Sequence, residues 1–136
     1  MKGNDSQTST NWMKALTKRK TNKRCPKCKA KVNAIYQFQD PPSFITLMIE
    51  RSLSVEMQHI MSVSGYEYKL YGLIYHGDHH FSCRVVDKSG GIWFHDGIHT
   101  KKNCEYEGNI SQVDPNMLMK ARHGRICILG IYVLVA

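Results

Sequence analysis

The chain has 136 residues, of which 42% are hydrophobic and 22% charged, and 19 Lys and Arg against 11 Asp and Glu give it a formal net charge of +8. These values are typical of one globular domain and exclude a fully disordered chain. No apolar run approaches the roughly 20 residues of a membrane-spanning helix. The polar N-terminus is unlike a secretory signal, and five cysteines are too few for a disulfide scaffold. We therefore expect a cytoplasmic or nuclear protein.

The positive charge is concentrated near the N-terminus. Residues 1–31 contain ten Lys and Arg and a single acid, Asp5, whereas the rest of the chain is nearly neutral. The first ten residues are rich in Ser, Thr and Asn, and we expect them to be disordered. A helix is expected over 12–20. The sequence thus predicts a basic, partly disordered lead over residues 1–24 and a folded domain over 25–136.

The folded part is expected to consist mainly of strands. Apolar and aromatic runs bounded by Pro, Gly and Ser are typical of antiparallel strands, and Gly90-Gly91 marks a hairpin turn. Strict alternation along one long run places Tyr68 and Leu70 on one face and Leu73 and Tyr75 on the other. A short helix is expected at 115–121, after Asp114 as N-cap. The fold class is therefore α+β, mainly antiparallel β, with strands expected at 43–49, 66–75, 81–86, 92–94 and 125–135.

Cys25-Pro26-Lys27-Cys28 is the first candidate site. Two thiolates separated by two residues on a tight turn can bind one tetrahedral Zn²⁺, and neighbouring lysines favour the thiolate form. A closed structural site needs four ligands, so this motif is half of one. The alternative is a pair of surface thiols without metal.

The second candidate lies in a histidine-rich region, since five of the seven histidines fall between residues 76 and 99. A metal cluster drawn from these histidines is one interpretation, although strand alternation would direct neighbouring side chains to opposite faces. The other interpretation pairs His80, at the start of a strand, with Asp96, at the end of the strand after the hairpin turn. A carboxylate that orients an imidazole is the arrangement that activates a nucleophilic thiol.

Several segments resemble the ubiquitin-specific cysteine peptidases. Gly77-Asp78-His79-His80-Phe81, the Gly90-Gly91 turn and Trp93-Phe94-His95-Asp96-Gly97 together are similar to the family's His box. Four further segments resemble its zinc ribbon, the strand after the ribbon, the strand before the His box and the closing strand, and they occur in the family's order: 25–28, 41–45, 68–76 and 131–135.

The resemblance implies a papain-like fold and cleavage of the isopeptide bond at the ubiquitin C-terminus. Residues 25–40 would form half of a zinc ribbon and residues 41–136 the palm. His80 would be the general base and Asp96 its orienting residue, while Cys25 and Cys28 would be two of four zinc ligands. His79 remains an alternative base, because the family commonly has a small residue at its position.

The family's nucleophilic Cys box has no counterpart before Cys25. Of the remaining thiols, Cys83 and Cys127 lie in apolar strands and Cys104 lies in a basic loop after the His box. We therefore expect the chain to be inactive alone, as a fragment, a degenerate form or a half that assembles with a chain carrying the Cys box. Ubiquitin or a ubiquitinated protein is the expected partner. The alternatives are a basic zinc ribbon that binds nucleic acid and a non-catalytic ubiquitin-binding protein.

Overall fold

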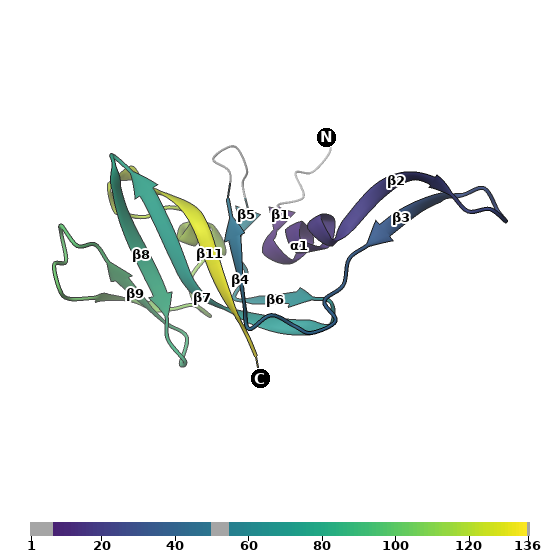
Figure 1. Ribbon diagram of the computed structural model, residues 1–136. Helices are drawn as coiled ribbons and strands as arrows, with labels where there is room; N and C mark the ends of the chain where they lie inside the picture. The colour runs from purple at the N-terminus through teal and green to yellow at the C-terminus, as the bar shows by residue number, and fades with distance from the viewer. Residues whose placement is uncertain (1–6, 50–54, 136) are drawn as a thin grey trace.

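The computed structural model describes residues 7–49 and 55–135. Its main element is a seven-stranded antiparallel sheet in the order β10-β9-β8-β7-β11-β4, with β6 paired to the first part of β7 (Figure 1). The strands of this sheet are β4 (Phe44–Met48), β6 (Ile60–Val63), β7 (Tyr66–Gly77), β8 (His80–Val86), β9 (Gly91–His95), β10 (Glu105–Asn109) and β11 (Ile126–Leu134). The expected class, α+β with mainly antiparallel strands, is confirmed.

The N-terminal part is more ordered than expected. Helix α1 (Ser9–Thr17) begins three residues before the predicted start, because the side chain of Thr8 accepts a hydrogen bond from the backbone amide of Asn11 and caps the helix. The expectation of disorder was wrong for residues 7–10, which form a short strand and the start of α1, while residues 1–6 lie outside the described residues. No helix in the described part of the chain is long and apolar enough to cross a membrane.

Helix α1 packs onto the sheet through its buried residues Ser9 and Met13. The hydroxyl of Tyr132 on β11 donates to the carbonyl of Gln58 at 2.6 Å and lies 3.0 Å from the hydroxyl of Ser9. The backbone amide of Gln58 in turn donates to the Ser9 hydroxyl. Because buried polar groups need partners, this network fixes the helix to one face of the sheet.

The core lies on that same face, and β7 contributes to it in a way that alternation did not predict. Tyr68, Leu70, Leu73 and Tyr75 are all buried, although they should lie on two faces. The pairing of β7 with β11 shifts register twice, between Cys127 and Leu129 and between Ile131 and Tyr132. An irregularity of this kind changes which side chains face the core, so both halves of β7 bury their large residues.

The predicted helix over 115–121 is instead a 3-10 helix, η1 (Pro115–Met119), capped by Asp114, whose carboxylate accepts from the amide of Asn116. Its Leu118 is buried, and the carbonyl of Leu118 accepts a hydrogen bond from the hydroxyl of Tyr75 at 2.6 Å. Lys120 then forms a bridge with Ile126. A second 3-10 turn, η2 (Arg122–Gly124), leads into β11. These contacts with the sheet end the helix within five residues.

Two small sheets accompany the main one. Strands β1 (Gln7–Thr8) and β5 (Val55–Glu56) pair in parallel. Strands β2 (Lys18–Arg24) and β3 (Lys31–Ile35) form an antiparallel hairpin that extends away from the main sheet, and we call residues 18–35 the arm (Figure 1). The arm crosses the boundary predicted after residue 24, so residues on both sides of it belong to one hairpin.

Candidate active site

His80 and Asp96 are brought together by the hairpin of β8 and β9. His80 is the first residue of β8, and Asp96 follows the last residue of β9, whose His95 pairs with Cys83. The position of His80 is fixed from the other side by a two-residue turn at Asp78 and His79, both of which have positive φ. Such turns match the twist of an antiparallel hairpin. The start of one strand and the end of the next therefore meet at one edge of the sheet.

The two side chains are in direct contact. Nε2 of His80 lies 2.8 Å from Oδ1 of Asp96. Asp96 has no solvent-exposed surface, whereas a quarter of the His80 side chain is exposed. His79, the alternative base, is exposed in the turn beside it, and the hydrogen bond to Asp96 comes from His80 instead. The geometry thus favours His80 over His79 as the imidazole that Asp96 orients.

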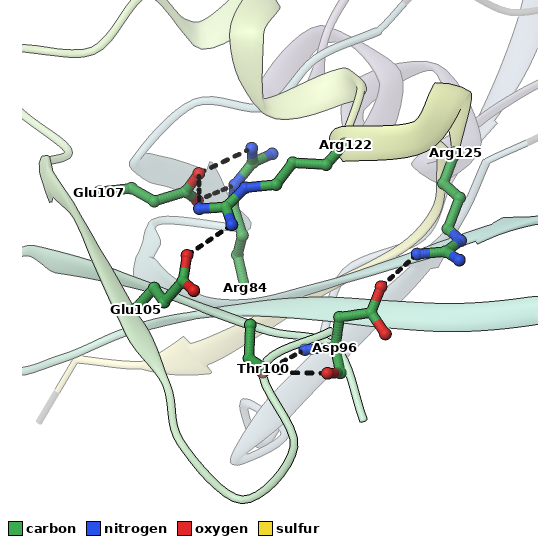
Figure 2. A network of polar contacts seen from close by, with 7 residues as sticks. All are labelled: Arg84, Asp96, Thr100, Glu105, Glu107, Arg122 and Arg125. Atoms are coloured by element: carbon green, nitrogen blue, oxygen red, sulfur yellow. Dashed lines mark hydrogen bonds and ion pairs between the residues drawn. The ribbon is translucent and has the colours of Figure 1, made fainter. Parts of the chain in front are cut away.

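Asp96 is held by several further groups (Figure 2). Its Oδ1 accepts a hydrogen bond from the backbone amide of Ile98 at 3.0 Å, and its Oδ2 accepts from the guanidinium of Arg125. Thr100 binds the backbone of Asp96 twice, because its hydroxyl accepts from the Asp96 amide and donates to the Asp96 carbonyl, each at 3.0 Å. The loop after β9 is therefore closed on Asp96, and the carboxylate has little freedom to turn away from His80.

These contacts also determine the charge of Asp96. Burial alone would raise the pKa of this carboxyl, but hydrogen bonds from the His80 ring, the Ile98 amide and the Arg125 guanidinium outweigh burial and hold the pKa well below its usual range. Asp96 is therefore a carboxylate at neutral pH. A buried carboxylate against a partly exposed imidazole can fix the tautomer of the ring and stabilise its protonated form.

Arg125 was not identified from the sequence. It is the residue before β11, 29 positions from Asp96, and it is buried. Its approach depends on Gly77, since a methyl group added there would lie 3.2 Å from Cγ and 3.3 Å from Cα of Arg125. The only signal in the sequence is a charged residue directly before an apolar strand. Thr100 and the Ile98 amide were also missed, although an Asp side chain that accepts from the amide two residues on is a common turn element.

The thiols of the described region do not complete a nucleophile–base pair. No hydrogen bond among the described residues joins His80 to a cysteine. Burial raises the pKa of Cys83, and it raises that of Cys127 to about 12, so both are protonated and poorly nucleophilic. Cys104 is exposed in the loop before β10.

Cys25 and Cys28 lie at the tip of the arm. The Cys25 amide donates to the carbonyl of Ala30, and the Lys29 amide donates to the carbonyl of Cys25, each at 2.9 Å. Hydrogen bonds from the backbone amides of Cys28 and Lys27 lower the pKa of the Cys25 thiol. Backbone amides directed at a cysteine sulfur favour the thiolate that a metal requires. The tip therefore suits two metal ligands.

A third metal ligand is not found near the tip, since no group of three or more His, Cys, Asp or Glu side chains suited to a metal occurs within 7–49 and 55–135. The same observation argues against the histidine cluster within those ranges. His95 instead bonds to the carbonyl of Lys101 at 2.8 Å, and His99 stacks on His123 with ring centroids 4.1 Å apart.

The sheet face opposite the core is apolar and open next to the candidate site. Phe44, Met48 and Phe81 on this face are each more than half exposed. A shallow cavity of about 840 Å³ spans β4, β11, β7 and β8, and it reaches Phe81, the neighbour of His80. Large contiguous apolar patches of this kind mark surfaces that contact another protein segment.

Comparison with known proteins places the chain by its fold. No protein-family model matches it, and no curated protein does. Among solved structures it is similar to the SAGA Ubp8/Sgf11/Sus1/Sgf73 DUB module, with a TM-score of 0.57 and 14% sequence identity. The similarity covers 97% of this chain and 34% of the matched chain, so this chain spans about a third of the length of that one. At such low identity the likeness shows a shared fold and no more.

Proposed function

We propose that the chain is the base-bearing part of a cysteine-type deubiquitinase, in which His80 is the general base and Asp96 its orienting residue. The proposal rests mainly on the 2.8 Å contact between the partly exposed His80 ring and the buried carboxylate of Asp96. The resemblance to the His box of ubiquitin-specific peptidases and the fold shared with a chain of a DUB module support it.

The proposed chemistry needs a thiol from outside this constellation. Because Nε2 of His80 contacts Asp96, Nδ1 would accept the proton of the thiol, and the thiolate would attack the isopeptide carbonyl. The protonated His80, stabilised by Asp96, would then give its proton to the leaving lysine amine. Water, activated by the same ring, would release the acyl group from sulfur and regenerate the thiol. Asp96 would stay ionised throughout.

The open apolar face of the sheet is evidence that a partner segment, which would carry this thiol, packs there. Burying Phe44, Met48 and Phe81 under a second segment would remove exposed apolar area from water, which favours association. Phe81 is the next residue along β8 and alternation turns it to the face opposite His80, so the thiol of this segment would reach the His80 ring around the end of the strand. We therefore propose that the complementary Cys-box segment packs on this face.

We also propose that Cys25 and Cys28 supply two ligands of a structural Zn²⁺. The amides directed at Cys25 and the position of both thiols at a hairpin tip, with Cys25 half-buried and Cys28 exposed, fit this role. Bound zinc would tie the two sides of the arm together.

The test uses an electrophilic ubiquitin C-terminal probe and a fluorogenic ubiquitin substrate. The purified chain should react with neither. After mixing with the part of a ubiquitin-specific peptidase that carries the Cys box, the chain should form an adduct with the probe and release the fluorophore from the substrate. His80→Ala should lower the rate of fluorophore release by at least about 1,000-fold, whereas His79→Ala should change that rate by no more than about two-fold.

Three results would contradict the proposal. An adduct on the chain alone, mapped to one of its five thiols, would show an unexpected nucleophile. Failure of the mixture to react, together with an absence of ubiquitin binding by the chain in NMR titration, would remove the deubiquitinase role. Ubiquitin binding that persists in the His80→Ala variant without any reaction would instead indicate the non-catalytic ubiquitin-binding alternative.

A further inference from the structure

The arm carries the whole formal excess of positive charge of the protein. It holds eight Lys and Arg, and no Asp or Glu occurs anywhere between residues 6 and 39. The other residues of the chain contain eleven cations and eleven anions, so the remainder is neutral. Every residue of β2 except Thr21 is exposed, and no ion pair among the described residues involves an arm cation. The arm is therefore a concentrated, unneutralised positive surface that projects away from the sheet (Figure 1).

The arm is also concave. The pairing of β2 with β3 shifts between Lys20 and Arg24, where three residues of β2 stand opposite one residue of β3. The extra residues bend the ribbon. The result is a hollow of about 530 Å³ lined entirely by cationic and hydrogen-bonding side chains: Lys20, Thr21, Asn22, Arg24, Lys31 and Asn33.

Two contacts keep the hollow in shape. The Thr21 hydroxyl donates to the carbonyl of Val32 across the irregularity. The guanidinium of Arg24 donates to the carbonyl of Lys29 at 3.0 Å, which holds it beside the tip of the hairpin. The cationic groups are thus placed by the backbone rather than gathered by chance on a mobile tail.

We propose that the arm is a binding site for duplex DNA, with the hollow seated on the phosphate backbone. The inference is independent of the proposed deubiquitinase function. A curved two-stranded ribbon fits the major groove of B-form DNA, which is about 12 Å wide, whereas the major groove of duplex RNA is too narrow for it. Lys and Arg bind phosphate oxygens, and the Asn and Thr side chains add donors suited to phosphate or base edges.

The composition of the arm favours a duplex over the other polyanions. Proteins that hold single strands stack bases on aromatic side chains, and the arm contains no aromatic residue within 18–35. The residues that dominate binding at protein–protein interfaces are mostly Trp, Tyr and Arg in well-packed, desolvated pockets. The hollow has no apolar residue in its lining, so it is built for a dense line of charge and not for a packed protein interface.

The experiment measures the affinity of the full chain for a fluorescent 20-base-pair DNA duplex by anisotropy, from about 50 to 300 mM salt. The test variant replaces the three cations of the hollow (Lys20→Gln, Arg24→Gln, Lys31→Gln). The matched control removes three exposed lysines outside the arm (Lys88→Gln, Lys101→Gln, Lys102→Gln). Circular dichroism melting checks that both variants remain folded, and the single strand, an RNA duplex and poly-glutamate serve as competitors.

The wild-type affinity should fall steeply with salt. In the hollow variant, the slope of log affinity against log salt concentration should be smaller in magnitude by about 2 to 3, and binding at about 100 mM salt should be roughly 30-fold weaker. The control should change the slope by less than about 1, although both variants lose equal charge. Equal loss in the control would overturn the site, because it would show a diffuse effect of net charge. Competition by poly-glutamate, single strand or RNA duplex as strong as by the DNA duplex would overturn the assignment to duplex DNA.

Discussion

The sheet and the arm differ in whether their charged side chains have ion-pair partners. In the described part of the sheet, each buried or half-buried arginine has a carboxylate partner: Arg125 binds Asp96, and Arg84 binds Glu107 at 2.6 Å (Figure 2). Arg84 also donates to the hydroxyl of Tyr75. In the arm, eight cations have no ion-pair partner among the described residues. A buried charge must be compensated inside the fold, whereas an exposed one is free to meet an external ligand. The sheet therefore uses charge for internal geometry and the arm presents it outward.

The largest effect is expected when the buried ion pair of the sheet is broken. Arg125→Met should lower the free energy of unfolding in urea by about 3 to 5 kcal/mol, because it leaves Asp96 buried without its cation. Arg122→Met is the control, since Arg122 is 40% exposed, and its loss should cost at most about 1 kcal/mol. Equal effects of the two substitutions would contradict the distinction between buried and exposed pairs.

The second prediction concerns packing in the sheet, which the arm lacks. A methyl group added at Gly130 would lie 2.0 Å from Cε of Met57, a fully buried side chain. Gly130→Ala should therefore destabilise the protein by about 1 to 3 kcal/mol in urea unfolding. In the Met57→Ala background the same substitution should cost much less, since the space is then free. An unchanged cost in that background would mean that the strain arises elsewhere.

The third prediction uses pH to separate the ionisation of Asp96 from its packing. The pKa of Asp96 is lowered in the folded protein, so its contribution to stability is complete above the unfolded value of about 4 and is lost as the pH falls toward the folded value. The free energy of unfolding of the native protein should decline below about pH 4 more steeply than that of Asp96→Asn. Parallel curves for the two proteins would show that Asp96 does not stay ionised in the fold.

The smallest effect on stability is expected in the arm. Cys25→Ser and Cys28→Ser should change the urea midpoint of the sheet by no more than the equivalent of about 0.5 kcal/mol, because both residues lie at an exposed tip. Added Zn²⁺ should nevertheless slow proteolysis of the native arm and leave the double variant unaffected. Zinc that protects both proteins equally would contradict a metal site at this motif.

Alkylation followed by mass spectrometry sharpens the same comparison. At about pH 7.5, Cys25 should react with iodoacetamide faster than Cys28, because backbone amides lower the pKa of the Cys25 thiol. Cys127 should react only on unfolding, since burial raises its pKa to about 12 and shields it. Zinc should protect Cys25 if the metal binds there. Slower reaction at Cys25 than at Cys28 in the absence of zinc would contradict the amide contacts.

The sequence by itself determined five strands of the main sheet (β4, β7, β8, β9 and β11), the hairpin that joins His80 to Asp96, and the segregation of charge. It did not predict β6, β10 or the two strands of the arm, where residues 18–20 were expected to be helical. The predicted features are local, because alternation, turn residues and charge runs operate over a few neighbouring positions. The pairing of His80 with Asp96 was predictable because both residues flank one hairpin whose turn the glycines mark.

Only the tertiary structure decided which long-range contacts position the candidate site, the core and helix α1. Arg125 reaches Asp96 across 29 residues, through the pairing of β11 with β7 and the space left by Gly77. Tyr68 and Tyr75 share the core because register shifts override strict alternation. Ser9 and Thr10 are ordered because α1 meets Tyr132 and Gln58, contacts more than 45 residues away in sequence. Contacts between distant segments depend on the whole fold, so no local pattern specifies them.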